Sequence, residues 1–177
     1  MRQHLADRLK KKKGIQVTPE NVFISSGSQG ALDAVGKVLI SKGDKIGVES
    51  PTYLGAIQAF DPYEPDYVTL ATDEKGLIPE SLETVLSRTP LKFIYLVPTF
   101  QNPTGRTLPM ERRERIAAIL TRYDVLLIED DPYSDMRYDG EPLKPLKALA
   151  PDHVLYIGTL SKVFAPGPSL KAVCSSG

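Results

Sequence analysis

A single lysine, Lys162, stands between a short apolar segment and a turn, where its amine could act as a nucleophile. The apolar segment is Val154 to Ile157, and Pro166 and Gly167 turn the chain after the lysine. The residues next to Lys162 carry hydroxyl or apolar side chains rather than charged ones. We therefore expect burial to lower the pKa of the Lys162 amine and to make it reactive toward carbonyls. A surface lysine in a loop is the alternative, and the other motifs must decide between the two.

Other polar groups follow the ends of further predicted strands. Short apolar segments predict strands at 22–24, 46–48, 67–70, 93–97, 125–128 and 154–157. In open parallel α/β sheets ligands bind outside the carboxyl ends of the strands, so side chains that follow different strands can meet in one crevice. The groups in such positions are Ser28 and Gln29, Tyr53, Asn102, Asp130 with Tyr133, and Thr159 with Ser161 and Lys162.

One part of this set suits a phosphate group. Gly27, Ser28 and Gln29 open a predicted helix, and the free N–H groups at such an end attract anions. Thr159 and Ser161 add hydroxyl donors near the lysine. Ser28 could instead be a simple N-cap of the helix.

The remaining groups suit a flat, cationic ring. Asp130 at the end of an apolar strand is costly to bury unless a cation meets it, either a protonated ring nitrogen or an arginine. Asn102 and Tyr133 can donate hydrogen bonds to a phenolate-like oxygen, and Tyr53 offers a flat ring for stacking. The two tyrosines could instead be packing residues. A phosphate, a cationic heterocycle, a ring oxygen and an aldehyde for Lys162 together describe pyridoxal phosphate.

The strands that would position these groups alternate with predicted helices. Helical periodicity or capping signals indicate helices at 2–13, after Gly30, at 54–60, after Pro79 and at 109–122, while 138–151 is predicted to be a loop. Short, continuous apolar strands that alternate with helices are typical of a parallel sheet. The predicted fold class is therefore α/β, with a mainly parallel sheet and helices on both faces.

Composition excludes several other kinds of protein. The 22 basic residues of the 177-residue chain balance 22 acidic ones, so nothing in the net charge favours nucleic acid or an anionic membrane. One cysteine and two histidines cannot supply a disulfide framework and poorly supply a metal site. No apolar run is long enough to span a bilayer, and the first residues do not resemble a signal peptide. We expect no metal, no membrane and a cytoplasmic location.

The motifs together resemble the class I/II aminotransferases of fold type I, and within them the 2-aminoadipate/kynurenine aminotransferase branch. The resemblance implies that Lys162 binds pyridoxal phosphate covalently, that Asp130 holds the ring nitrogen, and that Asn102 and Tyr133 hold the ring oxygen. It further implies Tyr53 over the ring. The implied phosphate ligands are Ser28, Gln29, Thr159 and Ser161. The matching segments are 26–32, 49–53, 98–105, 129–133 and 158–162.

The resemblance implies a transaminase that moves an amino group from an L-amino acid, 2-aminoadipate-like or broadly aromatic and aliphatic, to a 2-oxo acid such as 2-oxoglutarate. Such enzymes work as homodimers. Three alternatives share the motifs: the sensor domain of an aminotransferase-like transcription regulator, a carbon–sulfur lyase or amino-acid decarboxylase, and a remnant without catalysis. A winged-helix segment encoded upstream would favour the regulator.

The chain also departs from the family's pattern at both ends. Family members carry a segment before residue 2 and a C-terminal small domain, so residues 1–167 are expected to form a partial cofactor-binding large domain. After Gly167 the family continues with leucine and arginine, whereas Pro168 and Ser169 stand here. We expect 168–177 to be a tail foreign to the family and the sheet to lack its last strand.

Overall fold

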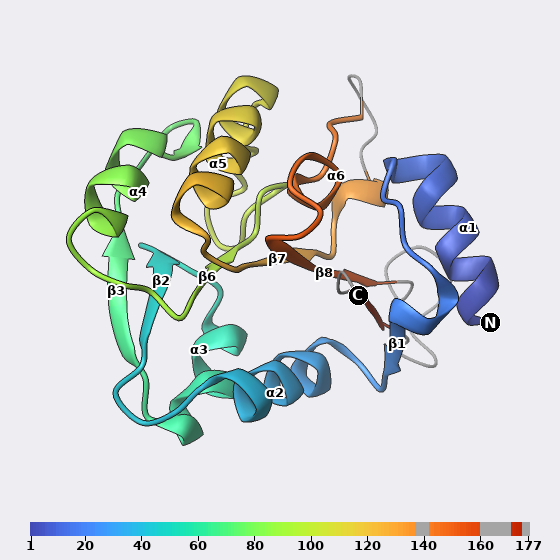
Figure 1. Ribbon diagram of the computed structural model, residues 1–177, viewed down its shortest axis with the longest axis horizontal. Helices are drawn as coiled ribbons and strands as arrows, with labels where there is room; N and C mark the ends of the chain where they lie inside the picture. Colours follow the sequence, from blue (N-terminus) through green and yellow to red (C-terminus); the bar gives the residue numbers. More distant parts are fainter. Residues whose placement is uncertain (137–141, 160–170, 175–177) are drawn as a thin grey trace.

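The computed structural model describes residues 1–136, 142–159 and 171–174. A seven-stranded sheet crosses this part of the chain in the order β1-β9-β8-β7-β6-β2-β3 (Figure 1). Every pairing is parallel except the two that β9 makes with β1 and β8. The strands are β1 Val22–Ser25, β2 Lys45–Glu49, β3 Asp66–Leu70, β6 Phe93–Leu96, β7 Leu127–Asp131, β8 Val154–Thr159 and β9 Lys171–Cys174. The predicted α/β class with a mainly parallel sheet is confirmed.

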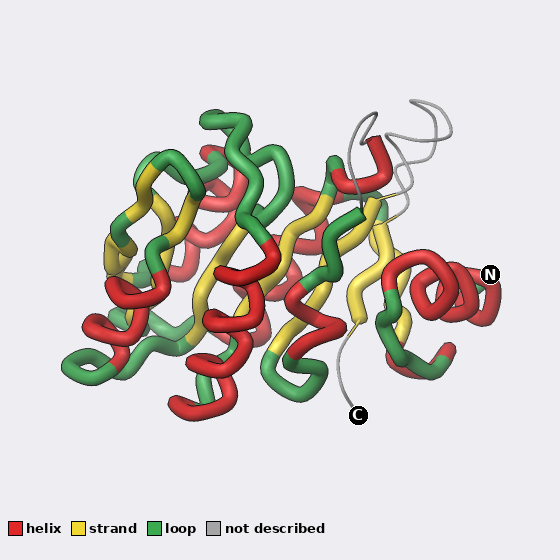
Figure 2. The backbone as a smooth tube through the Cα atoms, turned by 90° about the horizontal axis from the view of Figure 1, so that it is seen from above, coloured by secondary structure: helices red, strands yellow, loops and turns green. Residues whose placement is uncertain are grey.

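Helices cover both faces of the sheet, as Figures 1 and 2 show from two directions. Helices α4, α5 and α6 lie on one face, α2 and α3 lie on the other, and α1 lies beside β1. Their bounds are α1 Arg2–Lys13, α2 Ser28–Leu39, α3 Leu54–Phe60, α4 Pro79–Leu86, α5 Met110–Tyr123 and α6 Leu146–Leu149. A small hairpin, β4 Thr72–Asp73 with β5 Gly76–Leu77, and the single 3₁₀ turns Pro19–Asn21, Asp61–Tyr63 and Ser134–Met136 complete the described elements.

Alternation along the strands explains the two cores. Successive strand residues point to opposite faces, so Leu127 packs among α4, α5 and α6 while Ile128 packs toward α2 and α3. On the second face the ring of Phe60 meets Phe93 and Tyr95 edge to face, with centroid distances of 5.5 and 5.9 Å. Both faces of the central strands are therefore apolar, as the continuous apolar segments predict.

Helix α1 forms a third, smaller core at the β1 end of the sheet. Its buried side chains Leu5 and Leu9 pack with Val22 of β1 and Tyr156 of β8. The helix ends at Gly14, whose left-handed φ of 70° lets its N–H bond back to the carbonyl of Lys10. The predicted helix at 2–13 is confirmed, and its last residue, Lys13, is brought toward β7.

Three expectations are corrected by the structure. The sheet does not lack its last strand, because β9 lies between β1 and β8 and joins β1 to the rest of the sheet. Strand β7 begins at Leu127 rather than Val125 and continues through Asp131. The predicted loop at 138–151 contains α6, because the buried carboxylate of Glu129 accepts hydrogen bonds from the first backbone N–H groups of that helix.

Helices that could cross a membrane are not found among the described residues, where none is both long and apolar enough.

Candidate functional site

The candidate site lies at one edge of the sheet, where the parallel strands β1, β2, β6, β7 and β8 end. Because parallel strands share a direction, the segments that follow their carboxyl ends gather at this edge. Ser161 and Lys162 lie outside the described residues. The other predicted site residues follow or end these strands: Ser28, Gln29, Tyr53, Asn102, Asp130, Tyr133 and Thr159.

Asp130 is the buried anion of the site. Its residue is 2% exposed, and its Oδ2 accepts a hydrogen bond of 2.9 Å from the hydroxyl of Tyr95 on β6. Burial, and then the charge of Asp130, raise the pKa of Tyr95 well above its ordinary value, so the hydroxyl keeps its proton and remains a donor. Tyr95 was missed from the sequence, where the only signal is one hydroxyl in an otherwise apolar strand.

Tyr53 lies within electrostatic reach of that carboxylate and of Tyr133. Burial raises the pKa of Tyr53 first, and the neighbouring Asp130 and Tyr133 raise it further. The ring of Tyr53 lies against the backbone of Gly55, where an added Cβ would stand 2.5 Å from its Cζ. The structure thus brings together three predicted residues, Tyr53, Asp130 and Tyr133, and Gly55 provides the space for one of their rings.

The start of α2 forms another part of the edge. Gly27, with a φ of 136°, is the N-cap residue, and it has no side chain with which to cap the helix. The alternative of Ser28 as the N-cap is therefore wrong, since Ser28 is the first residue of the helix. The Gln29 side-chain amide donates to the Gly55 carbonyl at 2.9 Å and joins α2 to α3. An uncapped helix start leaves backbone N–H groups for an anion.

A second missed residue, Gln101, fixes the loop that carries Asn102. Gln101 is buried, and its Nε2 donates to the carbonyl of Pro51 at 2.8 Å. Its Oε1 accepts from the backbone N–H and the hydroxyl of Thr104 at 2.9 and 2.6 Å. These bonds tie the loop after β6 to the loop after β2, which carries Tyr53. Asn102 itself makes no side-chain hydrogen bond to the other candidates within the described residues.

Arg113 of α5 also fixes the loop that follows β6. Its buried guanidinium donates to the Pro98 carbonyl and the Thr99 hydroxyl at 2.8 Å each, and to the Leu108 carbonyl at 2.9 Å. The planar fork of arginine suits several fixed acceptors at once. Nothing in the local pattern of a charged amphipathic helix distinguishes this arginine from its exposed neighbours.

Glu49, the last residue of β2, is a buried carboxyl with an incomplete set of partners. It is 5% exposed, and its Oε2 has no hydrogen-bond partner among the residues that the structure describes. Burial raises the pKa of Glu49 to about 7, although Val97, Gln101 and Arg106 act in the opposite direction. It ends the strand that leads to Tyr53, and sequence reasoning did not select it.

The described residues fit pyridoxal phosphate. A fixed, buried carboxylate can face a protonated ring nitrogen, the Tyr53 ring can lie against a flat heterocycle, and the uncapped start of α2 can face a phosphate. Clusters of three or more metal-ligating side chains are not found within the described residues.

The chain belongs to the class I and II aminotransferase family, whose model matches residues 1–166. It is 42% identical over 173 residues to aromatic-amino-acid aminotransferase 1 of Thermococcus litoralis, covering 94% of this chain and 42% of that one. It is 41% identical over 157 residues to the 2-aminoadipate transaminase of Thermus thermophilus, covering 86% and 40%. The predicted resemblance to the class I/II aminotransferases, with 2-aminoadipate and kynurenine aminotransferases among the relatives, is confirmed.

Solved structures place the fold in the same family. A kynurenine aminotransferase from Pyrococcus horikoshii, solved in complex with PMP, superimposes with a TM-score of 0.92 at 42% identity over 99% of this chain and 45% of that chain. Similar proteins also include HTH-type transcriptional regulators, at 32 to 36% identity. The chain spans about two fifths of the length of the aminotransferases that it matches.

Proposed function

We propose that this chain is the pyridoxal-phosphate-binding part of an aminotransferase. The observation that carries the proposal is Asp130, a buried carboxylate that Tyr95 holds at 2.9 Å beside Tyr53 and Tyr133. A fixed, buried carboxylate can accept a hydrogen bond from the protonated nitrogen of a pyridine ring. The family of the chain supplies the rest of the interpretation.

Each candidate residue then has a role toward the cofactor. Asp130 keeps the ring nitrogen protonated, and Asn102 and Tyr133 donate to the ring oxygen. Tyr53 covers one face of the ring. The phosphate is held by Ser28, Gln29, Thr159 and Ser161. When bound, pyridoxal phosphate supplies an aldehyde and an electron-withdrawing ring.

Lys162, Asp130 and Tyr133 are the proposed catalytic residues. The Lys162 amine would hold the cofactor, and, once an amino acid had taken its place, the free amine would carry the proton from the substrate α-carbon to the cofactor carbon to which the lysine had been bonded. Asp130 acts by keeping the ring nitrogen of the cofactor protonated. The hydrogen bond from Tyr95 matters because it holds the Asp130 carboxylate in place for this role. Tyr133 acts by holding the ring oxygen.

For the whole protein we propose an amino donor of the 2-aminoadipate or the aromatic and aliphatic kind and a 2-oxo acid acceptor such as 2-oxoglutarate. The named aminotransferases among its relatives support this substrate class. We further propose a cytoplasmic homodimer, with residues 1–167 as part of the cofactor-binding domain. Residues 168–177 are proposed to differ from the family in sequence while supplying the strand β9.

A second candidate function is the sensor domain of a transcription regulator. It is favoured by the HTH-type regulators that match at 32 to 36% identity. The motifs that hold the cofactor do not separate a sensor from an enzyme, because both would bind pyridoxal phosphate.

The test is to add pyridoxal phosphate to the purified protein, record its visible absorption band, and assay a panel of amino donors with 2-oxoglutarate. Lys162→Ala should abolish the protein-linked band, and Lys75→Ala, at an exposed position, should keep it. A band that survives in Lys162→Ala would contradict the covalent assignment. A wild-type band without turnover of any donor would favour the sensor.

A further inference from the structure

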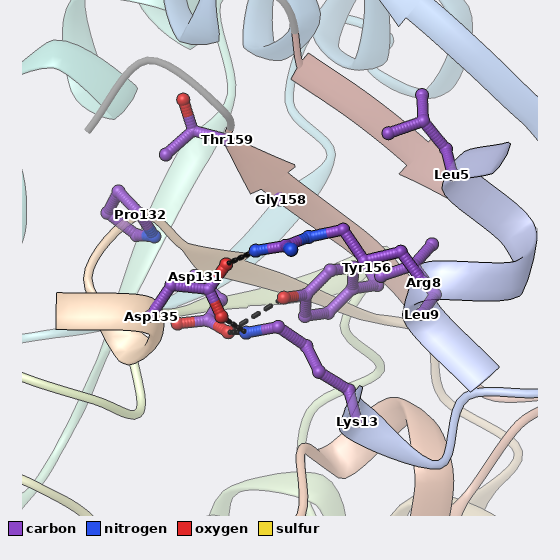
Figure 3. Close-up of a pocket in the computed structure, with 10 residues that line it drawn as sticks. All are labelled: Leu5, Arg8, Leu9, Lys13, Asp131, Pro132, Asp135, Tyr156, Gly158 and Thr159. Carbon is purple, nitrogen blue, oxygen red and sulfur yellow. Dashed lines mark hydrogen bonds and ion pairs between the residues drawn. The ribbon is translucent and has the colours of Figure 1, made fainter. Parts of the chain in front are cut away.

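Asp130 and Asp131 are adjacent in β7 and point to opposite faces of the sheet. The Asp131 carboxylate is buried at 6% residue exposure and faces α1 (Figure 3). It accepts hydrogen bonds from Lys13 Nζ at 2.9 Å and from the Tyr156 hydroxyl at 2.7 Å. Burial acts to raise the pKa of Asp131, but Lys13, Ser134 and Tyr156 outweigh it, and the net pKa is lowered. Asp131 is therefore an ionised, fully engaged side chain.

The same carboxylate shapes the turn that carries Tyr133. Its Oδ1 accepts the backbone N–H of Ser134 at 3.1 Å, and the Ser134 hydroxyl donates to Oδ2. The Met136 N–H then bonds to the Tyr133 carbonyl at 2.9 Å. Tyr133 thus lies inside a turn whose two ends are held, one by Asp131 and one by the following 3₁₀ turn.

Helix α1 holds this turn with two cations. Lys13 Nζ contacts Asp131 at 2.9 Å and Asp135 at 3.2 Å, and Arg8 Nη2 contacts Asp135 at 2.8 Å. Lys13 is the last residue of α1, where the helix dipole favours a positive charge. Figure 3 shows these side chains converging with Tyr156 of β8, from α1, from the end of β7 and from the 3₁₀ turn Ser134–Met136. We call Arg8, Lys13, Asp131, Asp135 and Tyr156 the α1 clamp.

The clamp is not built to hold a ligand. The cavity between its residues has a volume of only about 30 Å³, which leaves room for little more than ordered water. Its charged groups are already paired with one another. The cluster is better understood by what it holds in place, which is the segment from Asp131 to Met136.

We propose that Asp131 is a positioning residue for the cofactor site, and that the α1 clamp fixes Tyr133 beside Asp130. This inference rests on the proposed function, because Tyr133 matters only if it faces a cofactor. The clamp binds Asp131, which points to the opposite face of the sheet from Asp130. Asp131 follows Asp130 directly and precedes Tyr133 by two residues. Helix α1 is thereby part of the support of the site, through the turn that carries Tyr133.

The first experiment needs no cofactor and measures hydrogen exchange of the amides at 131–136. Asp131→Asn should speed exchange there about tenfold, the effect of losing about one hydrogen bond, and Lys13→Met, which leaves a buried charge unpaired, should speed it by more. Lys13→Arg, which keeps the charge, should stay near the wild-type rate. Asp73→Asn is the matched control, since it breaks an ion pair of 2.5 Å with Arg112 that does not touch the turn.

The second experiment measures pyridoxal phosphate affinity and the pH midpoint of the bound cofactor's absorption change. Asp131→Asn should weaken affinity about tenfold, since holding a group in its bound geometry lowers the ordering cost of binding. It should also shift the pH midpoint, because Tyr133 no longer holds the ring oxygen. A general loss of stability, as in Asp73→Asn, would leave the midpoint unchanged. If the Asp131→Asn protein fails to fold, the double variant Lys13→Met/Asp131→Asn is measured in its place, because it removes both charges of the ion pair.

Unchanged exchange at 131–136 in Asp131→Asn, or an unchanged midpoint with wild-type affinity, would overturn the positioning role. A wild-type protein that binds no pyridoxal phosphate would overturn the proposed function and the cofactor part of this inference. Even then, the exchange experiment still decides whether the clamp holds the turn, so the two failures are distinguishable.

Discussion

Two buried carboxylates at the same edge of the sheet behave in opposite ways. Glu49 ends β2 and Asp131 ends β7, and their exposures are nearly equal at 5% and 6%. Yet burial raises the pKa of Glu49 to about 7, whereas the pKa of Asp131 is lowered. Equal burial therefore does not imply an equal charge state.

The difference lies in the partners. Asp131 has the ammonium of Lys13 at 2.9 Å and the hydroxyl of Tyr156 at 2.7 Å, while Oε2 of Glu49 has no hydrogen-bond partner in the described part of the chain. Glu129 supports the same conclusion. It accepts two backbone N–H groups and is influenced by the charge of Arg113, yet burial, together with the charge of Asp131, raises its pKa to about 7. A cation in direct contact outweighs desolvation, whereas backbone donors with a cation that makes no ion pair do not.

The largest expected effect comes from removing the cation. Lys13→Met leaves Asp131 buried without its ion-pair partner and should lower the free energy of unfolding by about 4 kcal/mol at pH 7. Urea unfolding of both proteins measures this. Because the pKa of Asp131 is lowered in the folded protein, its contribution to stability disappears as pH falls, so the loss should shrink in acid. An equal loss at every pH would contradict the role of the charge.

A smaller, pH-dependent effect is expected at Glu49. A folded-state pKa of about 7, above the ordinary 4.5, means that the folded protein binds the extra proton, so Glu49 lowers stability as pH rises from 4 to 8. Between these two pH values the ionisation of Glu49 should lower the free energy of unfolding by about 3 kcal/mol. Glu49→Gln should remove it, which makes the variant more stable than wild type at pH 8 and nearly equal at pH 4.

Unfolding free energies at the two pH values test this prediction. Glu129 should keep a similar pH dependence in the Glu49→Gln protein, because its pKa is also raised to about 7. The unfolding free energy of the variant should therefore depend less on pH than that of wild type, but it should still depend on pH. A profile identical to that of wild type would show that Glu49 is ionised in the folded protein.

Tyr95→Phe should have a still smaller effect on stability. It removes one hydrogen bond to the buried Asp130 carboxylate and should cost about 2 kcal/mol, measured by urea unfolding. It should also weaken pyridoxal phosphate binding if Asp130 faces the ring nitrogen. Binding as tight as that of wild type would mean that Asp130 needs no support from Tyr95.

The smallest effect is expected for an exposed ion pair. Arg122 of α5 contacts Glu83 of α4, with side-chain exposures of 64% and 37%. Solvent and salt screen such a pair, so Glu83→Gln should change the unfolding free energy by less than about 0.5 kcal/mol. A loss as large as that of Lys13→Met would contradict the distinction between buried and exposed charges on which the comparison rests.

Much of the site follows from residue types and local spacing. Continuous apolar segments predict the strands, and polar residues directly after them, such as Tyr53, Asn102 and Asp130, predict the edge where they gather. This is possible because strand periodicity and the common direction of parallel strands are local and topological properties. Gly14 likewise marks the end of α1 by its own backbone freedom.

What only the tertiary structure decided is which partner each buried charge meets. Lys13 and Asp131 are separated by 118 residues, and no local pattern pairs them. Three further features also depend on contacts between elements that are distant in the sequence. They are the cap that Glu129 provides for α6, the hydrogen bond from Tyr95 to Asp130 and the place of β9 in the sheet. Sequence spacing determines which residues reach the end of a strand, but the packing of distant elements determines their surroundings, and the surroundings set the charge.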